Sequence, residues 1–119
     1  MLFYGALIKP LTNSLKRQER LFLIPINEVY VSAVSLWEIT IKVGLGKLDV
    51  SLVEILEELK KASFVVLQID SVYLQKLLDL PSIHKDPFDR LIIATAQAEG
   101  FTLITADENI QGYDVEWIW

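Results

Sequence analysis

Short apolar segments alternate with helical patterns along most of this chain, and that alternation limits the folds it can adopt. The segments 28–34, 64–69, 101–105 and 115–119 are rich in β-branched and aromatic residues and have the length of strands. Apolar strands separated by helical segments are typical of a parallel sheet that helices cover on both faces. We therefore predict an α/β protein, a three-layer α/β/α sandwich with a mostly parallel central sheet.

Four segments have helical character, and most of them carry end signals. In the second, apolar residues recur at i, i+3, i+4 and i+7, and Ser51 with Glu54 forms a capping box. Asp70 is placed to cap the third segment, and Gly100 is placed to end the fourth. The predicted helical segments are 35–48, with the helix ending near Gly44 and Gly46, and 51–62, 70–80 and 86–100.

Composition narrows the class of protein. The chain has 119 residues, 52% of them hydrophobic, which suits a single domain over residues 1–119 with a sizeable core. No apolar run reaches the ~18 residues of a membrane span, and the amino terminus lacks the basic region and cleavage site of a signal peptide. The absence of cysteine excludes thiolate metal sites and fits a reducing cytoplasm, and the single histidine argues against a multi-histidine zinc site. The net charge of −5 gives no bulk attraction to nucleic acid.

Four acidic residues stand out because they follow predicted strands or open predicted helices. In a parallel sheet, such positions gather beyond the carboxyl edge, where sites form. Carboxylate oxygens are the ligands that Mg²⁺ and Mn²⁺ prefer, and such a metal polarises a phosphate and activates a bound water. If these carboxylates converge, they predict a metal site. The four residues are Glu38, Asp86, Asp89 and Asp107.

Helix capping explains the same residues without a metal. Asp86 before Pro87 is an N-cap signature with proline at the first helical position. The pairs Ser35–Glu38 and Thr105–Glu108 have the spacing of capping boxes, and the second pair leaves Asp107 in a first helical turn. His84 fits a loop or surface position better than a metal ligand. Spacing alone leaves both interpretations open.

Two long segments resemble a known family. The sequences VYVSAVSLWEITIKVGLGKL and HKDPFDRLIIATAQAEGFTLITADENI are similar to PIN domains, and closely to the ribonuclease toxins of VapBC-type toxin–antitoxin pairs. The resemblance covers about residues 27–119. It implies a metal-dependent endoribonuclease, a hydrolase of RNA phosphodiester bonds that uses Mg²⁺ or Mn²⁺. It also implies an α/β/α sandwich, a homodimer, a cognate antitoxin partner, a cytoplasmic location and no membrane association.

The resemblance assigns roles to individual positions. Glu38, Asp89 and Asp107 match the acids that act in catalysis and hold the metal. Asp86 matches the first acid of the D-P-F-D form and is a supporting metal ligand. Thr105 matches the threonine of the T-x-D motif, which supplies a hydroxyl behind the metal ligands.

Residues 1–26 depart from the family pattern. The family begins with a central strand that ends in an aspartate, whereas Tyr4 falls near that position here. We expect residues 2–8 to form that central strand, and the departure suggests a truncated or rearranged amino terminus with impaired activity. The alternative is a catalytically inactive PIN-fold module that binds an antitoxin or associates with itself. A phosphoacceptor receiver domain fits less well, since the sequence lacks its acidic pair after the first strand and its lysine after the last.

Overall fold

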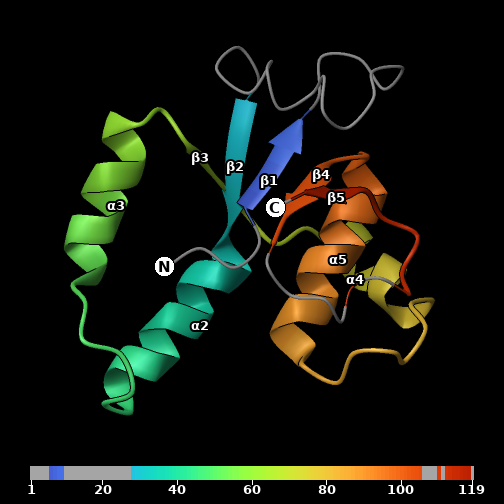
Figure 1. Ribbon diagram of the computed structural model, residues 1–119, viewed down its shortest axis with the longest axis horizontal. Coiled ribbons are helices and arrows are strands. Elements are labelled where there is room, and N and C mark those ends of the chain that lie inside the picture. Colours follow the sequence, from blue (N-terminus) through green and yellow to red (C-terminus); the bar gives the residue numbers. More distant parts are fainter. Residues whose placement is uncertain (1–5, 10–27, 106–109, 111, 119) are drawn as a thin grey trace.

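The computed structural model describes residues 6–9, 28–105, 110 and 112–118 and contains a five-stranded sheet in the order β3-β2-β1-β4-β5 (Figure 1). The middle strand of this sheet is the first in the chain, as we predicted for residues 2–8, of which 2–5 lie outside the described residues. The strands are β1 (Ala6–Lys9), β2 (Glu28–Ser32), β3 (Val65–Leu67), β4 (Thr102–Ile104) and β5 (Trp117–Ile118).

Four strands of the sheet run in one direction, and the central strand runs against them. β2 is parallel to β3 and β4 is parallel to β5, whereas β1 is antiparallel to both β2 and β4. Ala6 pairs with Val31 and with Ile104, so the amino end of β1 lies at the edge where β2 and β4 end. The prediction of a mostly parallel sheet is confirmed, and the reversed direction of β1 is an addition to it.

The helices follow the predicted segments closely where their caps are local. The Ser51 hydroxyl accepts from the Glu54 amide at 3.3 Å, and the Asp70 carboxylate accepts from the Val72 amide at 2.9 Å. Gly100 ends the last helix with φ 70°, a left-handed conformation that glycine adopts without strain. The helices are α2 (Ala33–Gly44), α3 (Leu52–Lys61), α4 (Ser71–Leu78) and α5 (Pro87–Glu99).

The start of α2 corrects one prediction. The cap is Ser32, the last residue of β2, whose hydroxyl accepts from the Val34 amide at 3.1 Å. The helix therefore begins two residues earlier than predicted, and Ser35 is a buried residue of its first turn. The proposed Ser35–Glu38 capping box is wrong, because Glu38 lies in the second turn, beyond the unpaired amides that a cap satisfies.

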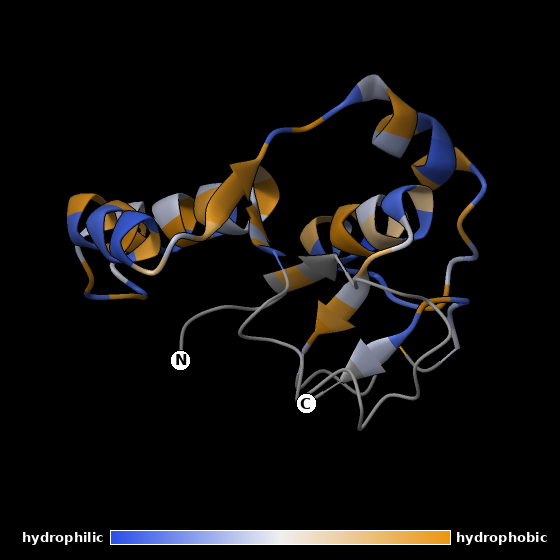
Figure 2. Cartoon of the chain, turned by 90° about the horizontal axis from the view of Figure 1, so that it is seen from above, coloured by the Kyte–Doolittle hydropathy of each residue, from blue (hydrophilic) through white to orange (hydrophobic). Residues whose placement is uncertain are grey.

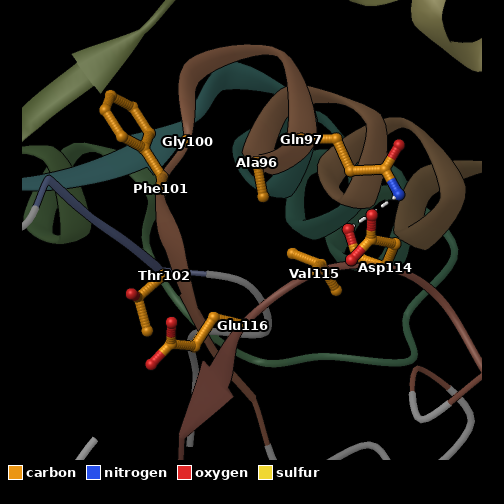
Figure 3. A pocket seen from close by; sticks show the side chains of 8 residues that line it. All are labelled: Ala96, Gln97, Gly100, Phe101, Thr102, Asp114, Val115 and Glu116. Atoms are coloured by element: carbon orange, nitrogen blue, oxygen red, sulfur yellow. Dashed lines mark hydrogen bonds between the residues drawn. The ribbon is translucent and has the colours of Figure 1, made fainter. Parts of the chain in front are cut away.

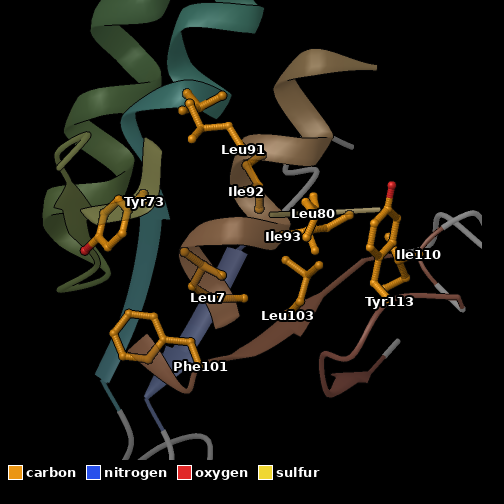
Figure 4. Packing of buried hydrophobic residues seen from close by; sticks show 12 residues of the cluster. Leu7, Tyr73, Leu80, Leu91, Ile92, Ile93, Phe101, Leu103, Ile110 and Tyr113 are labelled. Atoms are coloured by element: carbon orange, nitrogen blue, oxygen red, sulfur yellow. The ribbon is translucent and has the colours of Figure 1, made fainter. Parts of the chain in front are cut away.

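The hydrophobic core lies around α5, which packs against α4 and β4 on one face of the sheet (Figures 2 and 4). Every residue from Leu91 to Ala96 is buried, so this helix is enclosed on all sides. Leu7 of β1 is fully buried in the same cluster. The structure has the predicted α/β class and is consistent with a three-layer sandwich. In the described part of the chain, no helix is long and apolar enough to cross a membrane.

Candidate functional site

Asp86 is the N-cap of α5. Its Oδ1 accepts hydrogen bonds from the amides of Phe88 and Asp89, at 2.8 and 3.2 Å, and Pro87 occupies the first helical position. The capping interpretation of Asp86 is therefore confirmed. The bonds use Oδ1 alone, so the capping role leaves a metal-supporting role for the same carboxylate chemically open.

Asp89, one turn further along, faces a histidine. Its Oδ2 lies 3.1 Å from Nε2 of His84, and the two side chains are 24% and 12% exposed. The other ring nitrogen, Nδ1, accepts from the Asp86 amide at 3.1 Å. His84 lies in a loop, as expected, but its side chain is largely buried, between the Asp89 carboxylate and the backbone amide of Asp86. Sequence reasoning did not give it this role.

The loop that carries His84 is fixed at two points. The hydroxyl oxygen of Tyr113 accepts from the amides of Ile83 and His84, at 3.1 and 2.7 Å. The Nη2 atom of Arg90 donates to the carbonyl of Leu80 at 3.2 Å, while the Nε atom of Arg90 is buried without a hydrogen-bond partner. The loop before α5 is thus held by Tyr113 of the C-terminal segment and by Arg90 of α5 itself.

Glu38 lies on α2, which packs against α5. Its Oε2 lies 3.2 Å from Nζ of Lys42, one turn on, and its side chain is only 13% exposed. The neighbouring Trp37 packs edge-on against Phe88, with ring centroids 4.9 Å apart. This contact joins α2 to the start of α5 at the residues adjacent in sequence to Glu38 and Asp89.

Thr105 comes directly after β4, at the carboxyl end of that strand. It is buried, and it follows the last residue of the strand. Because Gly100 and Phe101 alone connect α5 to β4, the two elements run in opposite directions, and the start of α5 lies toward the end of β4. Asp107 and Glu108 lie outside the described residues. The predicted meeting of Glu38, Asp89 and Asp107 in one pocket therefore stays a prediction.

The donor chemistry fits a hard divalent cation, although the described residues contain no group of three histidine, aspartate or glutamate side chains placed to hold one. Glu38, Asp86 and Asp89 offer carboxylate oxygens, which Mg²⁺ and Mn²⁺ prefer. Glu38 lies close to the ammonium group of Lys42, and Asp89 lies close to the ring of His84. β1, with the sequence ALIK, adds no carboxylate.

A hollow of about 340 Å³ lies at the opposite end of α5 (Figure 3). One wall is closed by Gln97, whose amide donates to the carbonyl of Asp114 at 3.0 Å. A helix of 13 residues spans ~20 Å, so this hollow is separate from the acids at the start of α5. Its lining consists of Ala96, Gln97, Gly100, Phe101, Thr102, Asp114, Val115 and Glu116.

Comparison with known families shows which family the chain belongs to. The PIN domain family matches residues 6–116, nearly the whole chain, and the chain therefore belongs to the PIN domain family. PIN domains have a nuclease-type fold, generally depend on divalent metal ions and generally bind RNA. No curated protein and no solved structure matches the chain.

Proposed function

We propose that this chain is a metal-dependent endoribonuclease of the PIN-domain toxin type, with activity reduced by an incomplete set of acids. The observation that supports the proposal is the arrangement at the start of α5. There, hydrogen bonds and contacts hold Asp86 and Asp89 in place, in a chain that belongs to the PIN domain family. Their position beside the end of β4 corresponds to the sheet edge at which α/β proteins form their sites.

Glu38, Asp89 and Asp107 would hold Mg²⁺ or Mn²⁺, with Asp86 in support. When bound, such an ion supplies charge for a phosphate and an activated water for hydrolysis. Asp89 would offer a carboxylate already oriented by His84. Thr105, buried at the end of β4, would orient a neighbouring carboxylate through its hydroxyl.

The proposal of reduced activity rests on the lack of an acid in the central strand, β1. In the resembling family the first strand delivers an aspartate to the metal, and β1 contains none. Tyr4, which lies outside the described residues, falls in the sequence near the place of that aspartate and carries no negative charge near neutral pH. We therefore propose that an atypical amino terminus weakens metal binding and slows hydrolysis.

The second candidate function is a PIN-fold module that binds a cognate antitoxin or a second copy of itself. Exposed apolar residues favour it: Trp37 and Ile41 on α2 and Leu45 at its C-cap recur every four positions and are 55%, 37% and 64% exposed. On α3, Val53 and Leu56 are also exposed. Apolar surface of this kind is typical of an interface. We propose a homodimer or an antitoxin complex in the cytoplasm, and a strict monomer by light scattering at high concentration would contradict the homodimer.

Cleavage of labelled single-stranded RNA tests the first function against the second. We expect slow cleavage with Mg²⁺ or Mn²⁺, none with EDTA, and none by the triple variant Glu38→Gln, Asp89→Asn, Asp107→Asn. The matched control changes three acids outside the site in the same way: Asp49→Asn, Glu57→Gln and Asp79→Asn. Cleavage that is lost only in the first variant supports the nuclease. Equal cleavage by both variants contradicts it, and no cleavage by any form supports the binding module.

A further inference from the structure

We infer that His84 is a positioning residue that donates a hydrogen bond from Nε2 to Asp89 and thereby sets the orientation of this carboxylate toward a divalent cation. The inference rests on the proposed function, because it assigns a cation to Asp89. It adds a role to a residue that neither the capping pattern nor the acid pattern singles out.

The hydrogen bonds around the ring determine which nitrogen carries the proton. The amide of Asp86 donates to Nδ1 at 3.1 Å, so Nδ1 must present its lone pair. A neutral imidazole with an accepting Nδ1 carries its proton on Nε2. Nε2 lies 3.1 Å from Oδ2 of Asp89, within hydrogen-bond distance. Nε2 is therefore the ring nitrogen placed to donate to Asp89.

This donor matters because an aspartate carboxylate has no strong preferred rotation of its own. The terminal torsion of an aspartate is broad, so only contacts can fix the directions of its oxygens. A hydrogen bond from His84 to Oδ2 fixes the plane of the carboxylate. Groups that orient a metal-ligating carboxylate are commonly worth a factor of about 10–100 in metal affinity.

The backbone of His84 is also held in place. The His84 amide donates to the hydroxyl oxygen of Tyr113 at 2.7 Å, and Tyr113 is buried in the core. His84 is therefore fixed by its backbone to the C-terminal segment and by Nδ1 to the start of α5. Contacts therefore connect the buried Tyr113 to His84, and His84 to the carboxylate of Asp89.

A purely structural role is the competing explanation, in which the Nδ1 bond to the Asp86 amide only shapes the loop. Two substitutions separate the roles. The carbonyl of asparagine falls near the position of Nδ1, so His84→Asn keeps the acceptor for Asp86 and loses the donor to Asp89. The amide of glutamine reaches the position of Nε2, so His84→Gln keeps the donor and loses the acceptor.

The test combines Mn²⁺ titration with thermal unfolding of both variants. We expect His84→Asn to bind Mn²⁺ about tenfold more weakly or worse with near wild-type stability, and His84→Gln to keep affinity within about threefold with lower stability. A structural role alone would make His84→Gln the more damaging change for both quantities, and that result would overturn the inference.

Nitrogen NMR of the protein without added metal tests the hydrogen bond independently of the proposed function. His84 is the single histidine of the chain, so its ring signals are unambiguous. We expect the Nε2–H form, with a protected Nε2 proton that is lost in Asp89→Ala. A ring protonated on Nδ1, or a proton unchanged in Asp89→Ala, would overturn the inference. If the NMR result is as expected but wild-type protein binds no Mn²⁺, the proposed function falls and with it the cation role of His84.

Discussion

The hydroxyl oxygen of Tyr113 accepts a 2.7 Å hydrogen bond from the backbone amide of His84, 29 residues earlier in the chain. It accepts a second from Ile83 at 3.1 Å. One buried side chain of the C-terminal segment thus fixes the loop that precedes α5. The orientation of the acids at the start of α5 therefore depends on the packing of a residue remote in sequence.

Replacing Tyr113 with phenylalanine should destabilise the protein by about 1–3 kcal/mol, because two backbone amides lose their acceptor while the ring keeps its packing. Urea unfolding measures the loss. The control is Tyr30→Phe, which also removes a single hydroxyl but one that donates to Glu28 at an exposed position. Its cost should stay within about 0.5 kcal/mol. Equal losses for the two variants would show that Tyr113 does not anchor the loop.

Two substitutions of Asp86 should distinguish its role as a helix cap from a role in metal binding. Asp86→Ala should lower the free energy of unfolding by about 1 kcal/mol, whereas Asp86→Asn should cost little because the amide oxygen still caps α5. If Asp86 also supports the cation, Asp86→Asn should weaken Mn²⁺ binding while leaving stability intact. Asp70→Asn makes the same change at the cap of α4 and should leave Mn²⁺ binding unaltered. Identical Mn²⁺ binding by the two asparagine variants would limit Asp86 to capping.

The raised pKa of Tyr73 predicts that the protein loses stability at alkaline pH. Burial of its ring, followed by its 2.8 Å hydrogen bond to Glu99, raises the pKa of Tyr73 to about 12. An unfolded tyrosine loses its proton near pH 10, so the unfolded state binds fewer protons between pH 10 and 12. The stabilising contribution is full below pH 10 and falls as pH rises through this window. Denaturant unfolding from pH 8 to 11.5 should show a steeper decline in wild type than in Tyr73→Phe, and parallel declines would contradict the assignment.

Tyr4 offers a gain-of-function test of the atypical amino terminus. If the missing acid limits hydrolysis, Tyr4→Asp should raise Mn²⁺-dependent RNA cleavage by ~10-fold or more, because a carboxylate would add a metal ligand. Tyr4→Asn is the control, since it has nearly the same shape as aspartate without the charge. A gain in both variants would exclude a metal-ligand explanation. No gain in either would mean that this segment does not deliver an acid to the site.

Features set by nearby residues could be predicted from the sequence. The caps at Ser51, Asp70 and Asp86 and the end of α5 at Gly100 each depend on atoms within a few positions. The start of α2 was missed because Ser32 both ends a strand and caps a helix, and the sequence offered Ser35 as an equally suitable cap. Local pattern did not distinguish the two serines.

Features set by distant residues could not be predicted. The four residues of β1 have the same apolar character whichever way the strand runs, so its direction depends on pairing with β2 and β4. The contact between His84 and Asp89 depends on a backbone position that Tyr113 fixes and on a ring orientation that the Asp86 amide favours. The positions of the acids were predicted from the sequence, whereas the contact of His84 with Asp89 appears only in the structure.

Direct titration of Mn²⁺ into the metal-free protein, followed by electron paramagnetic resonance of the free ion, tests the central claim most directly. The wild type and Asp79→Asn, which changes an exposed aspartate at the end of α4, should bind Mn²⁺ equally. Asp89→Asn should bind it at least about tenfold more weakly, because the amide keeps the size of the side chain but removes the charge that holds a hard cation. Equal binding by all three proteins, or binding by none, would contradict a metal site at Asp89.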